Sequence, residues 1–99
     1  MQTKSIREEK VAIANQIIDD IQNQVLGVVE CREDVWLDRY ELQIRTVNFV
    51  FCFDITDMIY EIIKCKDSII PMEYKEIIDT IISEYKKYVY LKYFKEAVG

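Results

Sequence analysis

The sequence predicts an α+β fold: an N-terminal helix, a small antiparallel β-meander of two to three strands, and two C-terminal helices packed on the sheet. Apolar residues recur at helical spacing toward both ends of the chain and alternate with polar residues in the middle. Strands that are grouped between helices favour an antiparallel sheet over an alternating βαβ fold. Because the chain has 99 residues, 51% of them apolar, and no linker-like stretch, we expect residues 1–99 to form a single domain.

The first helix is predicted over residues 6–26. Ser5 and Glu8 form a capping box at its start. Apolar side chains then recur at helical spacing until Gly27, where the pattern stops. These side chains are Ile13, Ala14, Ile17, Ile18, Ile21 and Val25.

A β-hairpin is predicted around Thr46 and Val47, because the alternation of apolar and polar residues changes its parity between them. The turn contains either these two residues or residues 45–48, and both versions give the same register. That register places the apolar residues on one face as cross-strand pairs: Ile44 with Phe49, Leu42 with Phe51, and Tyr40 with Phe53.

Two interpretations of the segment before the hairpin stay open. In the first, residues 28–32 form a third strand that joins the hairpin through a turn around Glu33 and Asp34. In the second, residues 34–40 form a short helix. A helix over all of residues 34–45 is the main rival to the sheet itself.

Two further helices are predicted after the hairpin. Thr56 is the expected N-cap of a short helix that ends near Lys66, with Asp57 at its first position. Pro71 suits the first turn of a longer helix that reaches about Ala97. This last helix has a stripe of isoleucine and tyrosine for the core, and lysines near its C-terminus.

The absence of histidine removes the most common general base and the most common metal ligand from this sequence. Asp54, Asp57 and Glu61 have a spacing that suits Mg²⁺, but the start of a helix accounts for the first two. The three cysteines match no zinc-binding pattern. We therefore expect no enzymatic activity, no catalytic residue, no cofactor and no metal site.

The cysteines also indicate a compartment. Cys31, Cys52 and Cys65 are odd in number and widely spaced, which suits free thiols in a reducing cytosol. The first ten residues lack the apolar segment of a secretory signal. Charge-free stretches such as residues 21–29 are too short to span a membrane, so a cytoplasmic protein without membrane contact is expected.

The charge distribution predicts a basic protein surface as partner. The net charge is −5, and residues 11–62 carry ten acids against three arginines. An acidic middle disfavours direct contact with nucleic acid, because phosphates attract basic faces. Tyrosines and lysines do alternate near the C-terminus, as in some nucleic-acid-binding proteins, but lysines also suit the end of a helix.

An acidic segment around the single tryptophan is the predicted contact site for that partner. Aromatic side chains supply affinity in such sites, while the surrounding charges steer and select the partner. The alternative is that Trp36 covers the core and its acidic neighbours are solvated. The predicted partner-binding residues are Glu30, Glu33, Asp34, Trp36, Asp38, Tyr40 and Glu41.

Aromatic residues on the last helix predict an alternative function, a structural or regulatory homodimerisation module. They span nearly the whole circumference of the helix, so a single core cannot cover all of them. Exposed aromatic surface usually marks an interface. The predicted self-association residues are Tyr88, Tyr90, Tyr93 and Phe94.

The composition adds one further expectation. The chain is small and acidic, contains no histidine, two glycines and one proline, and is rich in isoleucine, lysine and tyrosine. In composition it resembles the small phage-encoded inhibitors of host nucleic-acid-binding enzymes, such as anti-restriction and anti-CRISPR proteins. The resemblance implies a non-enzymatic protein that occupies a basic, nucleic-acid-binding surface of a bacterial host enzyme. An inhibitor that mimics phosphate would lose association rate steeply with added salt.

Overall fold

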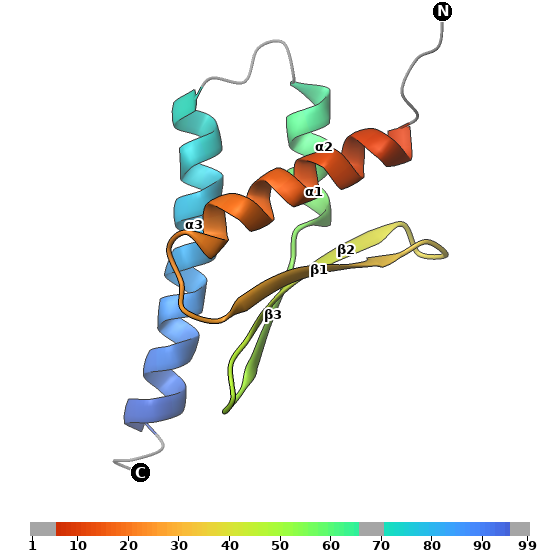
Figure 1. Ribbon diagram of the computed structural model, residues 1–99. Helices are drawn as coiled ribbons and strands as arrows, with labels where there is room; N and C mark the ends of the chain where they lie inside the picture. The colour runs from red at the N-terminus through yellow and green to blue at the C-terminus, as the bar shows by residue number, and fades with distance from the viewer. Residues whose placement is uncertain (1–5, 66–70, 96–99) are drawn as a thin grey trace, which may run out of the picture.

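The secondary structure follows the predicted order. The computed structural model describes residues 6–65 and 71–95 (Figure 1). Its elements are α1 (Ile6–Gln22), β1 (Val28–Asp34), β2 (Arg39–Arg45), β3 (Val50–Asp54), α2 (Thr56–Lys64), α3 (Pro71–Tyr90) and a π-helical turn, η1 (Leu91–Lys95). The α+β class is confirmed and the meander has three strands. A helix over residues 34–40 or 34–45 was the wrong alternative.

The three strands form one antiparallel sheet in the order β1-β2-β3. The helices gather on one of its faces, where α1 crosses α2 and α3 (Figure 1). Leu42, Ile44 and Phe51 on the sheet are buried against Ile17 of α1 and Ile81 of α3. None of the described helices is long and apolar enough to cross a membrane.

The other face of the sheet carries the alternate residues of each strand, and we call it the open face. The pairing of β1 with β2 and of β2 with β3 defines its members. They are Val28, Glu30, Arg32 and Asp34 on β1, Arg39, Glu41, Gln43 and Arg45 on β2, and Val50, Cys52 and Asp54 on β3.

The predicted register between β2 and β3 is wrong by two residues. Ile44 pairs with Phe51, not Phe49, and Leu42 pairs with Phe53. The turn contains residues 46–49, and not the predicted pair or residues 45–48. The Thr46 N–H donates to the carbonyl of Phe49 at 2.9 Å, and the Thr46 hydroxyl oxygen accepts from the N–H of Phe49 at 3.1 Å. Because side chains alternate with a period of two, this shift leaves the predicted apolar face intact.

Helix α1 ends at Gln22, four residues before the predicted end. The Gln22 amide bridges to the start of β1: its Nε2 donates to the carbonyl of Gly27 at 2.7 Å, and its Oε1 accepts from the N–H of Val29 at 3.0 Å. Gly27 lies so close to β2 that a Cβ there would be 2.7 Å from the carbonyl oxygen of Arg45. A glycine is therefore required by contact with the sheet. The proposed cap, Ser5, lies outside the described residues.

Thr56 is the first residue of α2 and not its N-cap. The N-cap residue is Ile55, whose side chain makes no capping hydrogen bond. The Thr56 hydroxyl instead accepts the backbone N–H of Tyr40 at 2.9 Å, and the Thr56 N–H donates to Asp54 at 2.8 Å. Thr56 thus joins α2 to β2. The predicted ends at Lys66 and Ala97 lie outside the described residues.

Candidate functional site

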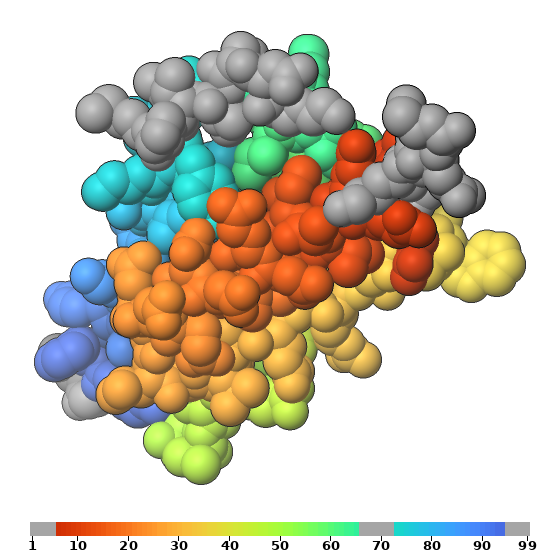
Figure 2. Space-filling model, turned by 45° about the horizontal axis from the view of Figure 1, so that its top comes forward, coloured from red at the N-terminus to blue at the C-terminus, as the bar shows by residue number. Residues whose placement is uncertain are grey.

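Three consecutive apolar side chains project from the turn between β1 and β2, residues 35–38, which we call the β1–β2 turn. Val35 is 64% exposed, Trp36 96% and Leu37 67%. The turn stands out from the body of the molecule, as the yellow segment of Figure 2 shows. The alternative in which Trp36 covers the core is therefore wrong.

The backbone of the β1–β2 turn is fixed by its own acidic residues. One carboxylate oxygen of Asp34 accepts the N–H groups of Trp36 and Leu37, each at 3.1 Å. Asp38 has φ 52°, in the left-handed region that aspartate tolerates better than most residues. These features hold the turn in one shape while its apolar side chains face outward.

A buried lysine ties the β1–β2 turn to two helices. Lys10 of α1 is 6% exposed, and its Nζ lies 2.9 Å from both carboxylate oxygens of Asp38. Tyr60 of α2 hydrogen-bonds to both groups through its hydroxyl, and the Lys10 Nζ lies 4.3 Å from the centre of its ring. The hydrogen bonds of Tyr60 and Lys10 lower the pKa of Asp38, and the Tyr60 bond is the main cause of the raised pKa of Lys10.

Glu33 and Tyr40 support the turn from the core side of the sheet. Tyr40 is 2% exposed, and its hydroxyl donates to Glu33 at 3.0 Å. Arg7 of α1 grips the same carboxylate with two hydrogen bonds, at 2.8 and 3.0 Å. Burial, followed by the Glu33 bond, raises the pKa of Tyr40 to about 12. The structure therefore places the Tyr40 side chain in the core, where it offers almost no surface to a partner.

Two further acids of the predicted partner-binding set, Glu30 and Glu41, lie on the open face among arginines. Arg39 pairs with Asp54 at 2.5 Å, and Arg45 pairs with Glu30. Glu41 accepts a hydrogen bond from Gln43 at 2.8 Å. All three arginines of residues 11–62 lie on this face, so its charges alternate in sign and do not form a purely acidic surface.

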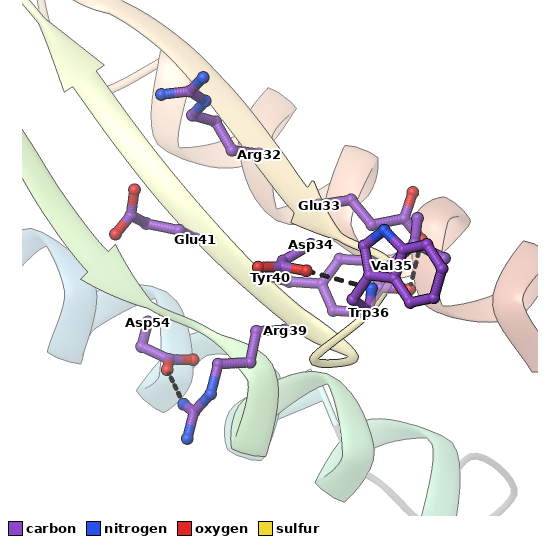
Figure 3. A pocket seen from close by; sticks show the side chains of 9 residues that line it. All are labelled: Arg32, Glu33, Asp34, Val35, Trp36, Arg39, Tyr40, Glu41 and Asp54. Atoms are coloured by element: carbon purple, nitrogen blue, oxygen red, sulfur yellow. Dashed lines mark hydrogen bonds and ion pairs between the residues drawn. The ribbon is translucent and has the colours of Figure 1, made fainter.

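A shallow hollow of about 570 Å³ joins the β1–β2 turn to the open face. Figure 3 shows Val35 and Trp36 at one end of the hollow, Arg32 and Glu41 at the other, and the pair of Arg39 and Asp54 along its side. A hollow with an apolar end and paired charges can hold a side chain of another protein. The residues that line it are Arg32, Glu33, Asp34, Val35, Trp36, Arg39, Tyr40, Glu41 and Asp54.

Of the three carboxylates whose spacing suits Mg²⁺, Asp54 is engaged in other contacts. Asp54 binds Arg39 and the N–H of Thr56, which lower its pKa, with Thr56 the larger cause. Within residues 6–65 and 71–95, no group of three His, Cys, Asp or Glu side chains is arranged to hold a metal ion.

The structure divides the predicted self-association residues into two groups. Tyr88 is half-buried against Phe51, with ring centres 5.5 Å apart, and Tyr93 packs on Phe49 at 5.9 Å. Tyr90 and Phe94 stack on each other at 5.2 Å and are each 59% exposed. Only the second pair offers its rings mainly to solvent.

Lys10 and Tyr60 belong to the site although they were not predicted from the sequence. A signal for Lys10 was present, because it lies four residues before Ala14 and so continues the buried stripe of α1. A lysine in such a stripe requires a partner that can reach it. No local pattern, however, identifies a partner such as Asp38, 28 residues away. In comparisons with protein-family models, curated proteins and solved structures, nothing matched this chain.

Proposed function

We propose that this protein is a non-enzymatic binding domain that inserts the β1–β2 turn into a depression on another protein. One observation carries the proposal: Trp36 is almost fully exposed on a turn whose backbone is fixed by Asp34 and Asp38. Large aromatic side chains dominate the energetics of protein interfaces. A turn that is already ordered loses little conformational entropy on binding.

The proposed partner is the basic, nucleic-acid-binding surface of a host enzyme, as in small phage-type inhibitors. The net charge of −5 supports this choice, because it favours encounter with a basic protein. The protein would block nucleic-acid binding sterically, because the turn supplies affinity and occupies the binding surface of the enzyme. Since Arg39 and Arg45 pair with acids of the open face, we expect the acidic residues to contribute mainly to the rate of encounter.

The test compares Trp36→Ala with Val47→Ala. Val47 is also apolar and 99% exposed, but it lies in the turn between β2 and β3. Wild-type protein and both variants are used to capture partners from nuclease-treated host lysate, and the captured partner is then purified and titrated directly. We expect Trp36→Ala to weaken this interaction at least about thirtyfold, the size of a hot-spot contact, and Val47→Ala to leave it unchanged. Equal binding by all three proteins would rule out the β1–β2 turn as the contact.

Binding at different salt concentrations tests the nature of the partner. If the partner is basic, added salt should lower the association rate more than it raises the dissociation rate. Competition by a nucleic acid that the partner binds should displace the protein. A partner that binds its nucleic acid and this protein together would contradict the inhibitor proposal while leaving the role of Trp36 in place.

A homodimerisation module is the second candidate, favoured by the exposed stack of Tyr90 and Phe94. Exposed aromatic pairs of this kind are typical of interfaces. The variant Phe94→Ser would convert such a dimer to a monomer in sedimentation velocity. A wild-type protein that remains monomeric would contradict this candidate.

A further inference from the structure

Strand β1 is an edge of the sheet, and its central backbone groups are unused. In an antiparallel pair, the N–H and C=O of one residue point to the same side, and successive residues alternate between sides. The N–H of Val29 donates to Gln22 and not to β2, so Val29, Cys31 and Glu33 direct their backbone groups away from the sheet. Among the described residues, no hydrogen bond reaches the outward backbone groups of Cys31.

Side chains from α1 reach this edge near its two ends. Gln22 binds the N–H of Val29 at one end, and Arg7 binds the side chain of Glu33 at the other. Cys31 lies midway between these contacts, at the centre of β1 (Val28–Asp34). The centre of the edge is thus the part that a further strand could pair with.

We propose that β1 pairs with β1 of a second copy of this chain, antiparallel and centred on Cys31, to give a continuous sheet in the order β3-β2-β1-β1-β2-β3. This register is symmetric about Cys31, the middle residue of β1, and so pairs the open centre of the edge with itself. It places Glu30 opposite Arg32 of the second copy, and the two-fold axis repeats that pair.

Charge selects this register over its neighbours. Shifting the register by two residues in one direction would place Glu30 opposite Glu30 of the second copy. Shifting it by two residues in the other direction would place Arg32 opposite Arg32. Like charges directly opposite each other destabilise strand pairing. Arg32 is exposed and has no ion pair within the described parts of the chain, so it is available for a carboxylate of a second copy. Charged edge strands usually prevent pairing, whereas here the alternation of sign permits one self-complementary register.

The dimer would carry two β1–β2 turns. Because the paired strands are antiparallel, the two turns that follow Asp34 would lie at opposite ends of the joint strand pair. Each Trp36 would remain free, so this pairing neither requires nor excludes the proposed binding function. It would make the protein bivalent toward a partner that offers two sites.

The test measures self-association by sedimentation velocity. It uses two single-substitution variants of the full chain, each alone and then mixed with the other. Glu30→Arg alone and Arg32→Glu alone each bring like charges together across the axis, and each should weaken self-association about tenfold or more. Mixed one to one, the two variants carry opposite charges at both facing positions. We therefore expect the mixture to associate about as tightly as the wild type.

The control is Arg39→Glu, which makes the same charge change on β2 of the open face, away from the edge. It should leave self-association unchanged, and circular dichroism should show that all variants are folded. The proposal fails if the wild-type protein is monomeric at concentrations on the order of 0.1 mM, or if the mixture associates no better than its components. Loss of the dimer in Phe94→Ser, but in neither charge variant, would assign the dimer to the last helix instead.

Discussion

The Nζ of Lys10 lies 2.9 Å from both carboxylate oxygens of Asp38, although 28 residues separate the two in the chain. The lysine side chain is 8% exposed and the aspartate side chain 49%. This pair connects the first turns of α1 to the end of the β1–β2 turn, and Tyr60 extends the connection to α2. It is a long-range link between the proposed contact site and the helical layer.

Replacing Asp38 by asparagine should destabilise the protein, because the buried ammonium group of Lys10 would lose its counter-charge. The lowered pKa of Asp38 means that its contribution is present above the ordinary value of 3.8 and is lost as the pH falls through the lower folded value. The raised pKa of Lys10 means that its contribution is present below 10.5 and is lost as the pH rises through the higher folded value. Urea unfolding of both proteins should therefore show the largest difference between these limits, and a difference that is constant down to pH 2 would contradict the assignment.

Trp36→Ala should change the free energy of unfolding by no more than about 0.5 kcal/mol, since the side chain is almost fully exposed. Tyr40→Ala should cost about 3–5 kcal/mol, because it empties a core position. Urea unfolding measures both values, and the native fluorescence of Trp36 should match that of tryptophan in water. If Trp36→Ala lowered the free energy of unfolding by several kcal/mol, Trp36 would be part of the core and the prediction would be wrong.

Thr56→Val should cost about 1–3 kcal/mol, because it leaves the buried N–H of Tyr40 without an acceptor while the shape of the side chain is kept. Thr80→Val is the matched control: the Thr80 hydroxyl donates to the carbonyl of Glu76 on the exposed side of α3. This control should change stability by no more than about 0.5 kcal/mol. Thermal or urea unfolding that gives equal costs for the two variants would contradict the bridging role of Thr56.

Cys31 should react with iodoacetamide more slowly than Cys52. Burial is the main cause that raises the pKa of Cys31 to about 11, so at pH 8 about a thousandth of it is thiolate. Cys52 is exposed on the open face. Peptide mass spectrometry after timed labelling would rank the two, and unfolding in urea should remove the difference. Faster labelling of Cys31 in the folded protein would contradict its burial.

The local patterns of the sequence predicted the type and order of the elements well. Alternation through Leu42 and Ile44 identified the sheet face, and Pro71 marked the start of α3. The patterns failed where a side chain decides the local hydrogen bonds. Thr46 closes a turn over residues 46–49, which shifts the register of β2 and β3. Gln22 ends α1 by binding the backbone of the next strand.

The candidate site was predicted as a segment, and the structure divided that segment by exposure. Trp36 lies on the surface and Tyr40 in the core, although both are aromatic residues of the same acidic stretch. Alternation predicts on which face of the sheet Tyr40 lies. It does not predict the exposure of a turn residue, which depends on whether another element covers the turn.

Periodicity, composition and charge can be read from neighbouring residues, so they were enough to predict the α+β class and the apolar face of the sheet and to reveal the excess of acid in residues 11–62. Which of those acids are paired depends on the folded chain. Asp38 meets Lys10, Glu33 meets Arg7, and Glu30 meets Arg45 only after α1 and the strands come together. Such pairs depend on distances in space between residues far apart in the chain, and no local pattern contains those distances.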